Sequence, residues 1–184
     1  LGASPVVLAL AAWTLVLNAN YTGAAGAWSY LPLLNPLDLG QIFVLGTLFV
    51  WVREQSRARG VLFAVLGTLT FAWLSAGAAR TVHHWLGVPF VWDRLVDSVA
   101  LQASWSILWT LLALGLMIHA TRRGLRTLWF AGFGLLGVVG LKLMLVDTAH
   151  VNTLGRTVSL LGVALLVIAA SYFAPTPPKA SEKS

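Results

Sequence analysis

The chain has 184 residues, of which 58% are hydrophobic and only 10% are charged, and its mean hydropathy is +0.82. An ordinary soluble domain carries about 25% charged residues, so the composition excludes a water-soluble globular domain. The high hydrophobicity also excludes intrinsic disorder. Cysteine is absent, which excludes disulfides, thiolate metal sites and a cysteine nucleophile. We therefore expect an integral membrane protein, and we interpret the net charge of +6 as basic loops at a membrane rather than a nucleic-acid surface.

Stretches that are poor in charge predict an all-α bundle of about six transmembrane helices. The expected spans are about residues 4–18, 36–52, 60–82, 94–121, 126–147 and 153–173. Most of them approach the length of about 20 residues that crosses the hydrocarbon of a bilayer. We expect residues 1–174 to form one transmembrane domain and residues 175–184 to be a disordered cytoplasmic tail.

The first two spans carry local signals at their ends. Asn18 and Asn20 interrupt the first apolar run, which predicts that its helix ends near Leu17. The second helix has a strong start signal, because Asn35 offers an N-cap, a proline follows it, and Asp38 lies near the positive end of the helix.

Basic residues predict the orientation of the chain. If the loop at residues 53–59 is cytoplasmic, alternation of the spans brings eight of the twelve basic residues to that side. These are Arg53, Arg57, Arg59, Arg122, Arg123, Arg126, Lys179 and Lys183. The positive-inside rule then predicts that both termini are cytoplasmic.

The opposite side of the predicted bundle holds a different set of polar residues. It carries Arg80, His83 and His84 after the third span, and Asp93 and Asp97 at the start of the fourth. The two aspartates are four residues apart and share a helix face. They are either favourable acids at a helix N-terminus or a cation site completed by Arg80 or by a metal.

Lys142 is the most unusual residue of the spans, because it lies inside the fifth helix. It either extends its ammonium toward the membrane surface or pairs with a carboxylate, for which Asp147 and Asp38 are the candidates. Arg156 in the first turn of the sixth helix opposes the helix dipole and also calls for an acidic partner. The simplest arrangement is Asp147 bridging Lys142 and Arg156.

Two stripes along the later helices are interpreted as packing faces. Ser98, Gln102, Ser106 and Thr110 recur at every fourth position, and Gln102 is the member most readily assigned to a site. Gly134, Gly137 and Gly140 recur at every third position, which predicts close approach of a neighbouring helix.

Several of these segments resemble the C-terminal region of a family of large, many-pass bacterial membrane proteins of unknown function. They are residues 102–110 (QASWSILWT), the Arg122-Arg123 turn, the segment Lys142–Asp147 (KLMLVD) and residues 156–159 (RTVS). The resemblance covers roughly residues 75–175. It implies a multi-pass protein of the bacterial inner membrane, and a chain that is a short member of the family or a terminal fragment of a longer one.

The sequence leaves three functions open. The first is a module that binds or moves an anionic envelope molecule, such as a lipid or glycan phosphate, through Arg80, Lys142 and Arg156 with His83 or His84. The second is a structural subunit that joins other membrane subunits or a missing N-terminal part. The third is a metal-dependent hydrolase built on Asp93, Asp97, Asp147 and the histidines His83, His84 and His150. The third lacks a recognisable metal motif, so no metal and no cofactor is expected, and the lipid bilayer is the expected partner.

Overall fold

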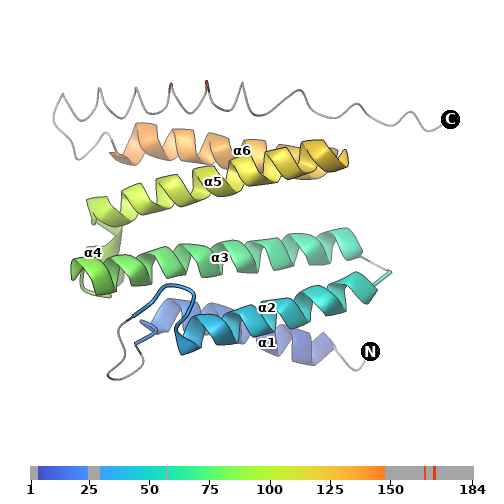
Figure 1. The fold of residues 1–184 in the computed structure, drawn as a ribbon, viewed down its shortest axis with the longest axis horizontal. Coiled ribbons are helices and arrows are strands. Elements are labelled where there is room, and N and C mark those ends of the chain that lie inside the picture. Colours follow the sequence, from blue (N-terminus) through green and yellow to red (C-terminus); the bar gives the residue numbers. More distant parts are fainter. Residues whose placement is uncertain (1–3, 25–29, 57, 148–163, 165–167, 169–184) are drawn as a thin grey trace. The chain divides into compact units, whose positions relative to one another are not determined.

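The computed structural model describes residues 4–24, 30–56 and 58–147, together with residues 164 and 168. The elements are α1 (Ser4–Asn20), α2 (Pro36–Glu54), α3 (Arg59–Leu86), α4 (Trp92–Val96), α5 (Val99–Arg123) and α6 (Arg126–Lys142), followed by a π-helical turn, η1 (Leu143–Asp147) (Figure 1). No strand occurs among these residues, so the predicted all-α class is confirmed. Within the sixth predicted span, 153–173, only residues 164 and 168 are described, both as helix, and the tail lies outside the described residues.

Four of the described helices are long and apolar enough to cross a membrane. They are α2, α3, α5 and α6 with the start of η1, and α1 is apolar but shorter. α1 continues to Asn20, three residues beyond the predicted end at Leu17. The predicted orientation of the termini remains a prediction.

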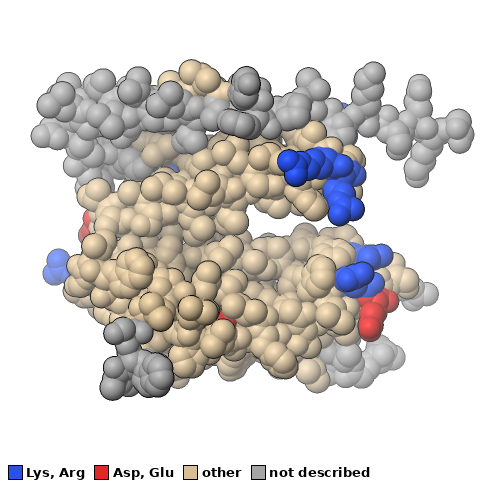
Figure 2. Space-filling model, viewed as in Figure 1, with Lys and Arg blue, Asp and Glu red and all other residues tan. Residues whose placement is uncertain are grey.

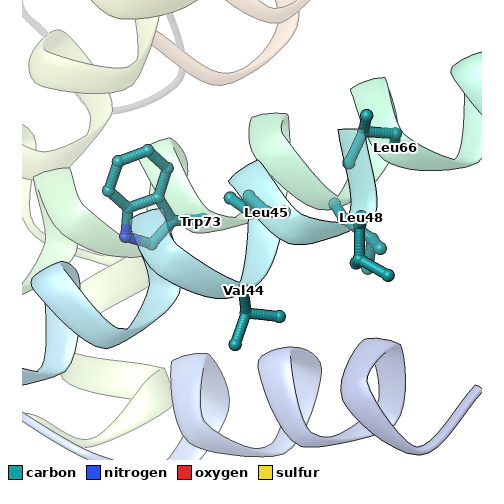
Figure 3. Close-up of a cluster of buried hydrophobic side chains, with 6 residues drawn as sticks. Val44, Leu45, Leu48, Leu66 and Trp73 are labelled. Atoms are coloured by element: carbon teal, nitrogen blue, oxygen red, sulfur yellow. The ribbon is translucent and has the colours of Figure 1, made fainter. Parts of the chain in front are cut away.

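The chain divides into two compact units, residues 1–101 (unit 1) and residues 102–184 (unit 2). In unit 1, α3 packs against both α1 and α2. Its apolar core comprises Val44, Leu45 and Leu48 of α2 with Leu66, Leu69 and Trp73 of α3. Figure 3 shows Val44 pointing toward α1 and Leu45 lying on the side of α2 that faces α3.

The two ends of unit 1 differ in chemistry. At one end, which we call the loop end, α1 finishes, α2 begins and α3 finishes. At the other, which we call the turn end, residues 55–58 connect α2 to α3. The polar residues described below lie at the loop end, above the apolar core.

The segment predicted as a single helix over residues 94–121 forms two helices, α4 and α5. The backbone N–H of Asp97 bonds to the carbonyl of Asp93 and closes α4, while the Ser98 hydroxyl accepts a hydrogen bond from the N–H of Leu101 at 3.5 Å. A hydroxyl that accepts from the third residue ahead is an N-cap arrangement. Ser98 therefore starts a new helix.

In unit 2, α5 and α6 are joined by a tight turn and pack closely near it. Gly124 adopts φ +66°, a conformation that glycine tolerates without strain. A Cβ added at Gly132 would lie 2.7 Å from Cγ of Met117 and 2.9 Å from the carbonyl oxygen of Ala113. Gly132, which the glycine stripe did not include, is thus the point of close helix approach. At Gly134, Gly137 and Gly140 no described atom lies within 4 Å of such a Cβ.

Candidate functional site

The start of α2 is built by a reciprocal pair of side chains. Asn35 Oδ1 accepts a hydrogen bond from the Asp38 N–H at 2.9 Å, so the predicted N-cap is confirmed. Asn35 Nδ2 in turn donates to Asp38 Oδ2 at 2.6 Å. Leu33 adopts φ +66°, which is costly for a residue with a side chain, and its N–H donates to the same carboxylate oxygen at 3.1 Å. These bonds fix the Asp38 carboxylate at the loop end.

The Asp38 carboxylate connects α2 to α3. Its Oδ1 accepts from Arg80 Nη2 at 2.7 Å and from Trp73 Nε1 at 2.8 Å. Asp38 is 1% exposed and Arg80 is not exposed at all. Removing two charges from water is costly, and only good geometry with further hydrogen bonds offsets that cost. Here both carboxylate oxygens are fully bonded.

Arg80 extends the same network to α1. Its Nη1 donates to Asn18 Oδ1 at 3.0 Å, so one guanidinium links α1 to the acid of α2. Asn18 is 7% exposed. Its side-chain oxygen bonds to Arg80 and not to the backbone of its own helix, so α1 continues past it. Arg80 is bonded to Asp38 and not to Asp93 or Asp97, both of which are exposed, so these two aspartates stay a predicted site only.

Several buried polar atoms at the loop end have no hydrogen-bond partner in the described part of the chain. They are Arg80 Nε, Asn18 Nδ2, both amide atoms of Gln41 and the hydroxyl of Tyr30. Gln41 follows Asp38 by three residues, so it lies on the same face of α2 one turn further along. Such atoms are rare in native proteins and call for a partner. Three of them are N–H groups that can only donate, so the set favours a guest rich in acceptor oxygens.

A loop segment packs over this network. A Cβ added at Gly23, which has φ +75°, would lie 3.3–3.4 Å from Asn35, Tyr30 and Arg80. His84 Nε2 donates to the Thr22 carbonyl at 2.9 Å, and its ring stacks on Tyr30 with centroids 4.3 Å apart. Burial raises the pKa of the Tyr30 phenol above its ordinary value of 10, and the nearby Thr81 hydroxyl opposes this only in part.

A pocket of about 290 Å³ lies beside the same loop. It is lined by Leu17, Tyr21, Thr22, Gly23, Ala24, Pro36 and Leu37. Its walls are largely apolar, and Gly23 borders both the pocket and the Arg80 side chain. The pocket is thus a largely apolar recess that meets the network only through the backbone at Gly23.

His83 meets the network through the ring of His84, which its own ring contacts edge to face with centroids 4.7 Å apart. His83 Nδ1 donates to the Val88 carbonyl at 2.6 Å and its ring contacts Phe90, so it fixes the turn after α3. Within the part of the chain that the structure describes, no three histidine or acidic side chains are placed to hold a metal ion.

Unit 2 contains Lys142, a half-buried cation at the end of α6. Lys142 Nζ donates to the Ser106 hydroxyl at 2.8 Å and to the Gln102 carbonyl at 3.0 Å. Gln102 therefore meets Lys142 through its backbone, and Lys142 joins α6 to the polar stripe of α5. Asp38, one of its two candidate acids, is bonded to Arg80 instead. The side chain of Asp147 and all of Arg156 lie outside the described residues, so their bridge to Lys142 stays a prediction.

Sequence reasoning missed Asn18, Gln41, Tyr30 and Trp73 as parts of the site. Asn18 was interpreted only as a helix breaker. A usable signal existed for Asn18 and Gln41, since each is an amide inside a charge-free run that the bilayer would otherwise disfavour.

Fold and site together define a multi-pass helical membrane protein with a buried ion pair at one end of its first unit. The chain belongs to the family described as Predicted membrane protein (DUF2339), which matches residues 1–177. The resemblance found in the sequence is thereby confirmed, and the match extends well beyond residues 75–175. No curated protein and no solved structure matches the chain.

Proposed function

We propose that this membrane protein binds or moves an anionic envelope molecule, such as a lipid or glycan phosphate, of the bacterial inner membrane. In this proposal the acidic group of that molecule is held at the loop end of unit 1, which the predicted orientation directs to the periplasm. The observation that carries the proposal is the set of unpartnered donors on Arg80, Asn18 and Gln41, each at least nine-tenths buried.

The electrostatics define how such a group would be held. Asp38 neutralises Arg80, so net charge attracts an anion only weakly here. Recognition would instead come from N–H donors aimed at phosphoryl or carboxyl oxygens, whose hydrogen bonds are stronger than those of neutral acceptors. The apolar recess beside Gly23 suits the adjoining carbon skeleton of an amphiphile.

Inorganic phosphate is the probe for this site, and the thermal unfolding midpoint of the detergent-purified protein is the measurement. A ligand at one hundred times its Kd adds about 2.7 kcal/mol to stability. We expect phosphate to stabilise the wild type and to lose most of this effect in Gln41→Leu. The control is Gln55→Leu, because the side chain of Gln55, the residue after α2, donates to the Trp51 carbonyl at the turn end. If phosphate raised the unfolding midpoint equally in the wild type and in Gln41→Leu, the proposal would be wrong.

A structural role is the second candidate, and the closed ion pair favours it. Asp38 and Arg80 bond to groups of α1, α2 and α3, so the network stabilises unit 1 without any guest. If phosphate has no effect on the wild type while loss of Asp38 unfolds it, this candidate replaces the first.

A further inference from the structure

The turn end of unit 1 carries a row of alternating cations and aromatic rings. The guanidinium of Arg53 lies over the Phe49 ring at 5.7 Å, and that of Arg59 lies over the Phe63 ring at 5.7 Å. The two rings meet edge to face with centroids 6.1 Å apart. The row Arg53–Phe49–Phe63–Arg59 therefore runs continuously from α2 to α3, and Phe63 anchors it by packing on the apolar core.

The rings place both cations at a defined depth. Each arginine is four residues from its ring, on the side toward the end of its helix, so its Cα lies about one helical turn nearer that end than the Cα of the phenylalanine. Arg53 and Arg59 are both exposed, and Phe49 is 44% exposed. In a helix that crosses a bilayer, this level is the boundary between hydrocarbon and headgroups.

The local charge at the turn end is not balanced. Arg59 lies in the first turn of α3, where a cation opposes the helix dipole. That turn contains no acid, and its N-cap residue, Ala58, provides no side-chain hydrogen bond. Glu54 is the one described acid nearby, and in the part of the chain that the structure describes neither arginine forms an ion pair. Figure 2 shows blue basic side chains beside one red acidic side chain at this end of α2 and α3.

We propose that the row Arg53–Phe49–Phe63–Arg59 binds the phosphate headgroup of an anionic phospholipid. The guanidinium forks match phosphate oxygens in geometry, and stacking on the rings orders them in advance. The exposed apolar surface of Phe49 and Val50 continues below the cations, where an acyl chain would lie. This site is separate from the loop end and does not depend on the function proposed there.

The test compares two phospholipids with the same acyl chains, phosphatidylglycerol and phosphatidylcholine. The full chain in detergent is titrated with each, and bound lipid is counted by native mass spectrometry. We expect the wild type to prefer phosphatidylglycerol and the double variant Arg53→Gln/Arg59→Gln to lose on the order of tenfold of that preference. Arg94→Gln is the matched control, because Arg94 is exposed and its guanidinium lies over no aromatic ring of the described residues.

A second variant separates the effect of the two arginine charges from the effect of the rings that order them. Phe49→Leu/Phe63→Leu keeps both cations and should lose part of the preference, whereas Gln41→Leu at the loop end should keep all of it. Equal binding of the two lipids by the wild type would overturn the proposal. A preference that survives in the double arginine variant, or that falls equally in Arg94→Gln, would overturn it too.

Discussion

The two units hold their helices together by different means. In unit 1 a buried carboxylate and guanidinium join three helices, with every Asp38 oxygen bonded and Arg80 fully buried. In unit 2 a glycine allows α5 and α6 to approach closely, and the half-buried Lys142 bonds to a carbonyl and a hydroxyl of α5. Unit 1 thus relies on matched charges and unit 2 mainly on shape.

This difference follows from the side chains available. The planar guanidinium of Arg80 contacts two helices at once because its donors diverge in a fixed fork. The ammonium of Lys142 is a compact charge that accepts whichever oxygens surround it. We therefore expect unit 1 to respond strongly to loss of one partner, and unit 2 to respond to added volume more than to loss of a hydrogen bond.

The largest effect is expected for Asp38→Leu. The change leaves Arg80 buried without its acid, and breaking a buried pair in this way costs about 3–5 kcal/mol. The measurement is thermal or denaturant unfolding in detergent micelles. Asp93→Leu is the control, because Asp93 is an exposed acid of the same unit. Similar losses in both variants would contradict the importance of the pair.

Gly132→Ala should have the next largest effect. The new methyl group would lie 2.9 Å from the Ala113 carbonyl oxygen, which belongs to the backbone, so the helices must separate. Overpacking of this kind costs about 1–3 kcal/mol. Gly134→Ala on the same helix has no described neighbour within 4 Å and should raise stability by about 0.5–1 kcal/mol. If both variants have the same sign, unit 2 does not rely on close approach at Gly132.

Ser106→Ala should produce a smaller loss in unit 2. It removes one acceptor of Lys142, and hydrogen bonds between membrane helices contribute about 0.6 kcal/mol on average. Thr121→Val serves for comparison, because the Thr121 hydroxyl donates to the Met117 carbonyl within the same helix. A loss in Ser106→Ala as large as that of Asp38→Leu would erase the contrast between the units.

The smallest effect at neutral pH is expected for Tyr30→Phe, and it should grow in alkali. Because burial raises the pKa of Tyr30, the folded state holds the phenolic proton more tightly than the unfolded chain. The contribution of protonated Tyr30 to the free energy of unfolding is therefore complete below the unfolded pKa near 10. It is lost as the pH rises through the pKa of the folded state. Unfolding midpoints measured from about pH 9 upward should fall less steeply in Tyr30→Phe than in wild type. The exposed tyrosine variant Tyr21→Phe should follow the wild type.

The sequence predicts those features that local chemistry decides. Apolar length located the described helices, and the pattern Asn35-Pro36-Leu37-Asp38 identified the start of α2 because an N-cap depends only on its immediate neighbours. The break at Asp97–Ser98 was missed, since apolar residues continue on both sides of it. The extension of α1 past Asn18 was also missed. An asparagine often ends a helix in water, but here its side chain accepts a hydrogen bond from Arg80, a residue far away in the sequence, and the helix continues.

The pairing within the site could not be derived from the sequence. Arg80 and Asp38 are separated by 42 residues. The sequence offered several acids as possible partners for Arg80 and Lys142. The order of the helices reduces the number of acids that can reach Arg80, because the start of α2 and the end of α3 lie at the same end of unit 1. Only the packing of the three helices decides between Asp38 and the exposed Asp93 and Asp97.

A double-mutant cycle on Asp38 and Arg80 tests the central claim most directly. The unfolding free energies of wild type, Asp38→Leu, Arg80→Leu and the double variant are measured under the same detergent conditions. We predict that the double variant is more stable than Asp38→Leu alone, because removing both partners leaves no stranded charge, and that the coupling energy is on the order of 3 kcal/mol. Effects that add within about 0.5 kcal/mol would show that the two side chains do not act as a pair and would contradict the account.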